Sequence, residues 1–171
     1  QGVDELLEGI VATLPPPSGD ISKPLQAVIF DAQYDAYRGV VALCRVKEGE
    51  LRPGQRISFM HTKKEYEVEE VGLLQLKRVR KKTLAAGEVG YVIANIKTIR
   101  DIAIGDTITE VLNPAEEPLP GYKDANPVVF SSIYPMSTDQ YGELTKALDK
   151  LTLNDPALTY EKDSSAALGF G

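Results

Sequence analysis

The sequence predicts a mainly β protein in which a small closed barrel is followed by part of an α+β unit. Two observations carry this prediction. Short β-rich runs, separated by glycine, proline and charged turn residues, occupy residues 25–111, and such spacing is typical of a small barrel. Helical periodicity then appears between two extended runs in residues 127–164, which indicates a strand-helix-strand unit.

The first predicted element is a helix at residues 3–14. Pro15–Pro17 end it, because proline has no amide hydrogen to donate to a further turn. No earlier element of the sequence can cover its apolar face, so we expect it to be the remnant of a domain upstream of Gln1. Its apolar side chains recur at steps of three and one and form a single stripe: Val3, Leu6, Leu7, Ile10, Val11 and Leu14.

Six β-rich runs are expected to form the barrel wall. Gly49 and Gly54 offer the positive φ that tight reversals between them need. In the fourth run the apolar positions change from 66 and 68 to 71 and 73, which predicts a β-bulge at Glu69 or Glu70. The runs are LQAVIF at 25–30, GVVALCRV at 39–46, QRISFM at 55–60, KEYEVEEVGLLQL at 64–76, EVGYVIANI at 88–96 and DTITEV at 106–111.

The C-terminal third begins with a proline-rich stretch without periodicity, residues 113–125, which we interpret as an interdomain linker. PVVFSSIYPM at 127–136 is then predicted to be a strand, and ALTYEKDS at 157–164 a second one. Between them, residues 137–155 are predicted to be a helix that opens on a capping box of Ser137 and Gln140. We expect this unit to be the first part of a domain that continues after Gly171.

The net charge of −6 is unevenly distributed. Residues 25–111 carry 14 basic and 12 acidic residues, whereas both flanking segments are acidic. A nucleic-acid contact is therefore expected on the middle segment. The single cysteine, Cys44, lies in an apolar run and is expected to be a buried strand thiol in a reducing compartment. No run approaches the roughly 18 apolar residues of a membrane helix, so no membrane insertion is expected.

The sequence contains none of the patterns that bind nucleotides or catalyse hydrolysis. It has no GxxxxGK[ST] loop and no GxGxxG after a strand. His61 is the single histidine, so a zinc site would need an unusual set of carboxylates. Carboxylate pairs such as Glu65 and Glu67 are expected to solvate a strand face. We therefore expect no catalytic, metal-binding or cofactor-binding residue in this chain.

One concentrated charge feature remains, LKRVRKKTL at 76–84. Its cations could neutralise the phosphates of a nucleic-acid backbone, or they could be the solvated edge of a sheet, where lysines discourage aggregation. The sequence leaves both interpretations open. Arg38, Lys63 and Lys64 are weaker candidates for contact with phosphate. The cluster places five positive charges in six positions, at Lys77, Arg78, Arg80, Lys81 and Lys82.

Several segments together resemble elongation factor 4, the LepA-type family of translational GTPases. The resemblance runs from end to end, and PAEEPLPG and the terminal SAALGFG are its more specific parts. The segments, in order, are FDAQYDAYRGVVALCRVKEGELRPGQRI, AGEVGYVIANIK, IGDTIT, NPAEEPLPGYK and LNDPALTYEKDSSAALGFG.

The resemblance implies a division of the chain into four parts. Residues 1–24 would be the last helix of the GTP-binding domain with its proline linker. Residues 25–112 would be the translation-factor β-barrel, 113–125 the linker, and 126–171 the opening of a ferredoxin-like third domain, a truncated βαβ unit.

The resemblance also implies a function for the parent protein. The parent would hydrolyse GTP with Mg²⁺ and act on the translocated ribosome and its tRNA, by back-translocation or as a fidelity factor under stress. The nucleotide-binding motifs would lie upstream of Gln1, so these 171 residues would be noncatalytic.

The barrel would contact small-subunit ribosomal RNA, for which the candidates are Lys77, Arg78, Arg80, Lys81, Lys82, Arg38, Lys63 and Lys64. A monomer in the bacterial cytoplasm is expected, and peripheral contact with the inner membrane or an organellar origin stays open. The alternative hypothesis is a protein-interaction barrel whose basic strand binds an acidic protein partner.

Overall fold

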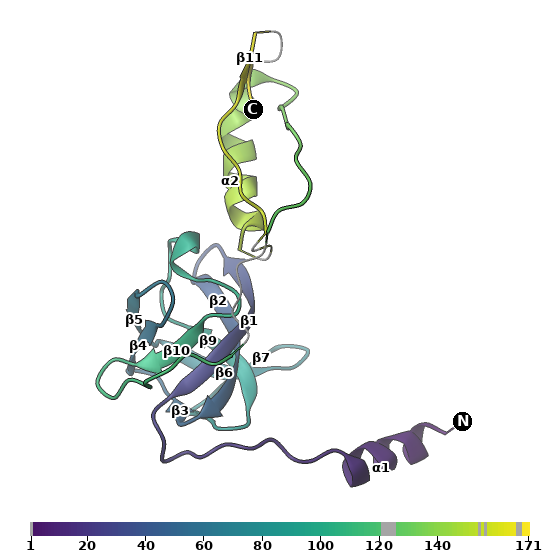
Figure 1. Ribbon diagram of the computed structural model, residues 1–171, viewed down its shortest axis with the longest axis vertical. Helices are drawn as coiled ribbons and strands as arrows, with labels where there is room; N and C mark the ends of the chain where they lie inside the picture. Colours follow the sequence, from purple (N-terminus) through teal and green to yellow (C-terminus); the bar gives the residue numbers. More distant parts are fainter. Residues whose placement is uncertain (1, 121–125, 154, 156, 167–168) are drawn as a thin grey trace.

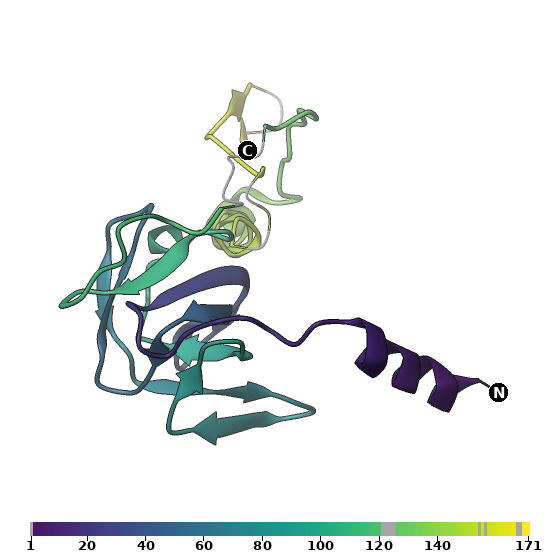
Figure 2. The same cartoon turned by 60° about the horizontal axis from the view of Figure 1, so that its bottom comes forward.

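Three parts follow one another in the computed structural model, which describes residues 2–120, 126–153, 155, 157–166 and 169–171. A helix on an extended arm, α1, is followed by a β-barrel and then by a smaller unit around the helix α2 (Figure 1). After a turn of 60°, α1 still stands clear of the barrel, and α2 still lies beside it (Figure 2). The fold class predicted from the sequence is confirmed, although the C-terminal unit differs in detail.

The barrel is one antiparallel sheet of eight strands in the order β5-β4-β10-β1-β2-β9-β6-β7. Each of the six predicted runs forms at least one of these strands. Two short strands, β3 (Glu50–Leu51) and β8 (Leu84–Ala85), pair separately with each other. The eight strands are β1 (Gln26–Asp35), β2 (Gly39–Glu48), β4 (Arg56–Phe59), β5 (Glu65–Glu67), β6 (Glu70–Leu74), β7 (Arg78–Lys81), β9 (Val89–Ile93) and β10 (Thr107–Glu110).

The barrel closes where the chain changes its partner strand between β5 and β6. β5 pairs with β4, whereas β6 pairs with β9. Between them, the Val68 amide donates to the Gln55 carbonyl at 2.9 Å and the Glu69 amide donates to the Ile93 carbonyl at 2.8 Å. The feature predicted as a bulge is therefore a break between two strands. The apolar alternation shifts there because Val68 and Val71, three positions apart, both belong to the interior core.

Strand β2 is buried on both of its faces, which explains its unbroken apolar run. Alternate residues fill the barrel interior, and the residues between them pack on the outer face. Cys44 is 0% exposed, and burial raises the pKa of its thiol to about 12, so the predicted buried thiol is confirmed. The interior members are Val40, Ala42, Cys44 and Val46, and the outer cluster contains Val41, Leu43, Tyr91 and Ile93.

The first helix is present as predicted, as α1 (Val3–Thr13). None of its residues is buried, and the apolar Val11 is 78% exposed. Residues 14–20, which include the prolines, then run without regular structure to the barrel. In the described part of the chain, neither α-helix has the length and apolar character needed to cross a membrane.

The C-terminal unit contains the predicted helix, but not the predicted strands. Residues 138–151 form the 3-10 turn η2 (Thr138–Gln140) followed by α2 (Tyr141–Leu151). The predicted capping box is wrong, since the Ser137 hydroxyl bonds to the Asp139 carboxylate and makes no cap hydrogen bond.

The strand predicted at 127–136 is wrong, and the one predicted at 157–164 is wrong apart from its last residue, Ser164, which begins a short strand. In the described residues, strand pairing in this unit is limited to β11 (Ser164–Ser165) with β12 (Gly169–Phe170). An extended segment becomes a strand when a neighbour accepts and donates its backbone hydrogen bonds, and residues 127–136 have no such neighbour among the described residues. Their apolar side chains stay exposed, with Phe130 at 86% and Met136 at 100%.

The stretch interpreted as a linker is partly fixed to the barrel. The Ala115 amide donates to the Thr109 hydroxyl at 2.8 Å, and the Leu119 amide donates to the Thr107 hydroxyl at 2.9 Å. The Gln26 side chain also donates to the Glu117 carbonyl at 2.7 Å. Residues 121–125 lie outside the described residues.

Candidate nucleic-acid interface

The basic cluster lies on a hairpin formed by β6 and β7, which projects from the barrel (Figure 1). β7 is the last strand in the sheet order, so it is the edge strand that one of the two interpretations required. The Gln75 amide donates to the Lys77 carbonyl at 3.2 Å and closes the turn. Leu76 is fully exposed at the tip. The fold therefore presents the cluster to solvent on a narrow projection.

Carboxylates of the barrel hold the two arginines of the cluster. The Arg80 guanidinium lies 2.7 Å from a Glu70 carboxylate oxygen, and Arg38 donates to the same oxygen at 3.1 Å. The other Glu70 oxygen accepts the hydroxyl hydrogen of Tyr91 at 2.7 Å. Arg78 donates to Asp35 at 2.9 Å. Glu70 is only 8% exposed, so it is the centre of a network between the hairpin and the barrel wall.

This network changes the pKa of its members. Burial by itself raises the pKa of Glu70, but the hydrogen bonds from Tyr91 and Arg38 and the nearby guanidinium charges outweigh it and lower the pKa. Burial and the bond to Glu70 raise the pKa of Tyr91 to about 12. The hydrogen bond from Arg78 is the main cause that lowers the pKa of Asp35. At neutral pH the network therefore consists of charged arginines, ionised carboxylates and a protonated tyrosine.

The lysines of the cluster divide into two kinds. Lys81 is paired with Glu88, and the hydrogen bond from Lys81 is the first cause that lowers the pKa of that carboxylate. Lys77 and Lys82 are exposed, and neither has an ion-pair partner among the described residues. Of the five predicted cations, these two lysines therefore have charges that no carboxylate of the described residues balances.

Arg38 lies at the start of β2, beside an almost fully exposed Tyr37. Its guanidinium lies between Glu70 at 3.1 Å and Glu69 at 3.7 Å. The structure therefore brings Arg38 and Arg80 to one carboxylate, although they are far apart in the sequence. Arg38 is committed to the barrel network, which weakens it as a free contact for phosphate.

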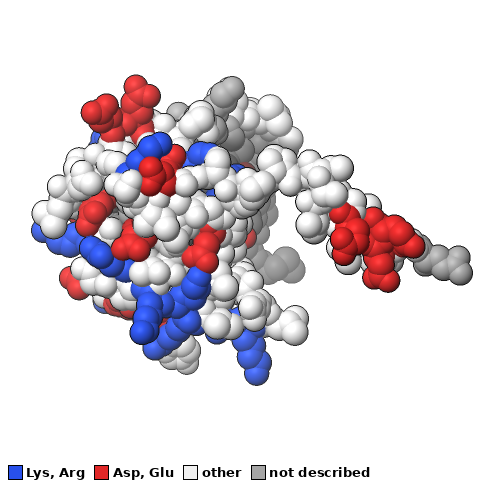
Figure 3. Space-filling model, turned by 90° about the horizontal axis from the view of Figure 1, so that it is seen from below, with Lys and Arg blue, Asp and Glu red and all other residues white. Residues whose placement is uncertain are grey.

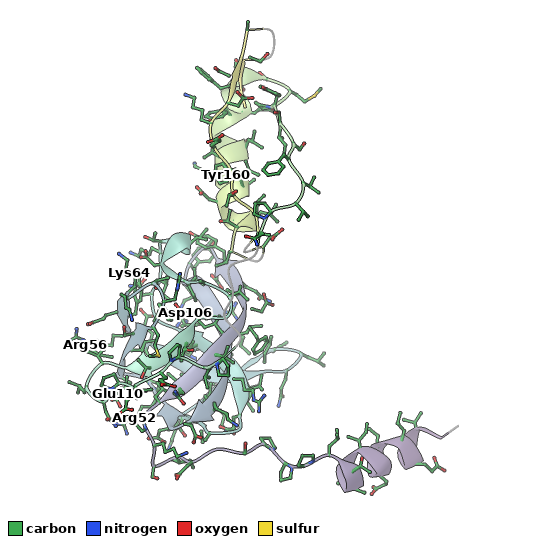
Figure 4. The ribbon with its side chains drawn as sticks, in the orientation of Figure 1. Arg52, Arg56, Lys64, Asp106, Glu110 and Tyr160 are labelled. Carbon is green, nitrogen blue, oxygen red and sulfur yellow. The ribbon has the colours of Figure 1, made fainter. Side chains whose placement is uncertain are left out.

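Lys63 and Lys64 lie in the turn between β4 and β5. Figure 4 shows Lys64 and Arg56 on the side of the barrel that carries these strands, away from the β6–β7 hairpin. The buried Asp106 carboxylate fixes this turn by accepting the His61 amide at 2.8 Å and the Thr62 amide at 3.3 Å. Lys63 and Lys64 are therefore exposed on a fixed turn, but this turn is separate from the basic cluster of the β6–β7 hairpin.

Glu70, Asp35 and Glu88 are the residues of the candidate site that the sequence did not identify. A count of cations in one segment contains no information on carboxylates that arrive from other strands. Figure 3 shows the result, since basic and acidic side chains alternate over the face of the barrel seen from below. The charged side chains of the arm that carries α1 are acidic.

The described residues contain no group of three or more histidine, cysteine, aspartate or glutamate side chains placed to hold a metal ion. The arrangement of the hairpin suits electrostatic contact with a polyanion. Its arginines are paired with carboxylates of the barrel. Its two free lysines lie at opposite ends of β7, Lys77 in the turn and Lys82 at the barrel end.

Comparison with known proteins identifies the barrel. Residues 39–109 match the family model described as elongation factor Tu domain 2. A solved crystal structure from Thermus thermophilus superposes on 99% of this chain and 25% of its own, with a TM-score of 0.70 at 24% identity. At that identity the superposition supports the fold alone.

Proteins that are similar to this chain over its whole length are named elongation factor 4. A protein of Rhodopirellula baltica named elongation factor 4 2 is 60% identical over all 171 residues. Proteins named elongation factor 4 from Syntrophobacter fumaroxidans and Treponema denticola are each 54% identical over the same length. The chain spans 28–29% of the length of these relatives. The resemblance found in the sequence is therefore confirmed: over its whole length, this chain is similar to a segment of proteins named elongation factor 4.

Proposed function

We propose that this chain is the noncatalytic, ribosome-binding middle segment of a translational GTPase of the elongation factor 4 type. The observation that carries the proposal is similarity to elongation factor 4 over the whole chain, in a barrel that exposes unbalanced cations on a projecting hairpin. The whole protein acts on the translocated ribosome, by back-translocation or as a fidelity factor under stress. GTP and Mg²⁺ bind in a part of that protein outside these residues.

We propose the same division into domains that the resemblance to elongation factor 4 implies. Residues 1–24 are the last helix of the GTP-binding domain with its proline linker, and residues 25–112 are the second domain. Residues 113–125 connect it to a ferredoxin-like third domain that begins at residue 126. The exposed apolar side chains of 128–136 support this assignment, because a lone half of such a sandwich leaves its inner face open.

We assign different roles to the cations of the hairpin. Lys77 and Lys82 contact the phosphate backbone of small-subunit ribosomal RNA, because their charges are not balanced by protein carboxylates. Arg78, Arg80 and Lys81 hold the hairpin at a fixed angle through their ion pairs. Arg38 supports the same network, and Lys63 and Lys64 are secondary contacts.

In this proposal the whole protein also contacts tRNA and is a monomer of the bacterial cytoplasm, and the parent associates peripherally with the inner membrane. Similarity to elongation factor 4 supports the proposal, in which the segment is a rigid spacer. Its task is to hold RNA-facing surfaces at fixed angles between the GTPase and the later domains.

The test is binding of the chain to purified small ribosomal subunits at several salt concentrations. A double variant, Lys77→Gln with Lys82→Gln, should weaken binding and reduce the slope of log K against log[salt] by about 0.9 for each phosphate that the variant no longer neutralises. Arg45→Gln with Lys47→Gln removes the same charge from β2, in another part of the barrel, and should change the slope little. Equal weakening in both variants, or none in either, would remove the hairpin from the proposed interface.

A further inference from the structure

A groove of about 560 Å³ lies between the barrel and α2. Its volume is within the range of small-ligand sites, about 300–1,000 Å³. We call it the junction groove. Its barrel wall includes Tyr34, Lys97 and Thr98, and its helix wall includes Lys146, Asp149 and Lys150.

Specific contacts hold the two walls together. Leu153, directly after α2, is 4% exposed and belongs to the hydrophobic core of the barrel. The Lys150 ammonium lies 5.5 Å from the centroid of the Tyr34 ring, a cation–π distance. The groove is therefore a product of the packing of the C-terminal unit on the barrel.

The junction groove has an excess of positive charge. It is lined by three lysines and one carboxylate, that of Asp149, which accepts the Tyr160 hydroxyl at 2.6 Å. Among the described residues, none of the three lysines forms an ion pair, whereas Arg38, Arg78 and Arg80 of the hairpin network each do. Such uncompensated ammonium groups attract an anion, and the attraction is stronger beside low-dielectric walls than in open water.

We propose that the junction groove binds a phosphate group. Lys97, Lys146, Lys150 and Thr98 line one groove, and together they offer a donor set that suits a multiply charged anion rich in oxygen atoms. The phosphate belongs either to an RNA strand or to a free phosphorylated molecule, since both present the same chemistry to the lysines. The site is formed by residues other than those of the β6–β7 hairpin and does not depend on the RNA contact proposed for it.

The experiment measures binding of two probes to the 171-residue chain by titration calorimetry. Tripolyphosphate represents a free phosphorylated ligand, and a single-stranded oligouridylate represents RNA. The groove variant combines Lys97→Gln, Lys146→Gln and Lys150→Gln. The matched control combines Lys23→Gln, Arg45→Gln and Lys47→Gln, which remove the same charge from residues outside the groove. All three groove lysines are exposed, so their substitution leaves the core intact.

The expected result is a loss of affinity of at least about tenfold in the groove variant and little change in the control. Loss for tripolyphosphate identifies a free ligand as an occupant, and loss for oligouridylate alone identifies an RNA phosphate. For RNA, the salt slope should fall by about 0.7 for each lysine that contacts phosphate.

A second measurement does not depend on any variant. Addition of the bound probe to the unmodified chain should shift the amide resonances of Thr98 and Ile99 at the groove, whether or not those of Val79 in the hairpin also shift. Equal weakening in both variants, absence of binding of either probe to the unmodified chain, or shifts confined to the hairpin would each overturn the proposal. The hairpin lysines are intact in every variant, so failure here is distinct from failure of the proposed ribosomal contact.

Discussion

Substitution of Glu70 separates the structural and the RNA-binding roles of the basic hairpin. Glu70 is 8% exposed and accepts a hydrogen bond from Tyr91 while it pairs with Arg38 and Arg80. Glu70→Ala leaves the buried Tyr91 hydroxyl without its acceptor. Glu70→Gln retains an acceptor but removes the charge, so the two variants differ in what they remove.

The expected magnitudes follow from burial. An unsatisfied buried hydroxyl costs about 1–3 kcal/mol. Each ion pair contributes about 0.2–1 kcal/mol, because both guanidinium groups remain in contact with water. We expect Glu70→Ala to lower the free energy of unfolding by about 2–4 kcal/mol and Glu70→Gln by about 0.5–2 kcal/mol. Glu65→Ala, which breaks the exposed pair with Arg56 at 2.8 Å, is the matched control and should cost about 1 kcal/mol or less.

The pH dependence of unfolding provides a second measurement. Folding lowers the pKa of Glu70 below its ordinary value of 4.5, so the unfolded chain binds this proton more readily than the folded protein. The stabilisation by Glu70 is therefore complete above that ordinary value and is lost as the pH falls through the lower folded pKa. Below about pH 4.5 the original protein should lose more stability than Glu70→Gln does.

The assay is urea denaturation at several pH values, together with RNA binding at neutral pH. Because Glu70 neutralises Arg38 and Arg80, Glu70→Gln should destabilise the barrel yet strengthen binding to RNA. A change of less than about 0.5 kcal/mol in Glu70→Ala, within the range of an ordinary surface substitution, would refute the argument that this network supports the hairpin.

Three further predictions concern the packing. Gly72→Ala places a Cβ 2.3 Å from the Val79 carbonyl oxygen and 2.7 Å from the Tyr91 hydroxyl, so denaturation should show a loss of about 1–3 kcal/mol; Gly142→Ala, with nothing within 4 Å, should instead stabilise by up to about 1 kcal/mol. Leu153→Ala should weaken the docking of α2 by about 2–4 kcal/mol, seen as faster amide exchange in α2, whereas Leu112→Ala at an 84% exposed position should have no such effect. The Cys44 thiol should resist disulfide reagents at pH 8 until the protein unfolds, because its pKa is about 12 and it is 0% exposed; rapid labelling of the native protein would show that β2 opens easily.

The elements predicted correctly are those whose signal is local. The helix at residues 3–14 and the helix after Ser137 follow from spacing along a few turns, and the strands of the barrel follow from apolar runs between turn residues. The buried position of Cys44 follows from its apolar neighbours. Each of these patterns depends only on residues close together in the sequence, and each predicted element is retained in the folded protein.

The predictions that failed depended on partners far along the chain. Residues 127–136 have the composition of a strand, but no described segment pairs with their backbone. The bulge predicted at Glu69 or Glu70 is a change of partner strand, which periodicity cannot distinguish from an inserted residue. In both cases the apolar pattern is present in the sequence, but the strand that each segment pairs with is set by segments elsewhere in the chain.

Local patterns along the chain were sufficient to predict most of the barrel strands, the two helices, the buried thiol, the basic cluster and the family resemblance. Which cations of that cluster are balanced follows from the folded arrangement, because Asp35 lies in β1, Glu70 in β6 and Glu88 just before β9. The folded arrangement also created the junction groove, whose lysines come from separate segments. The physical reason is that hydrophobic periodicity is a property of neighbours in the chain, whereas charge balance is set by distances in space.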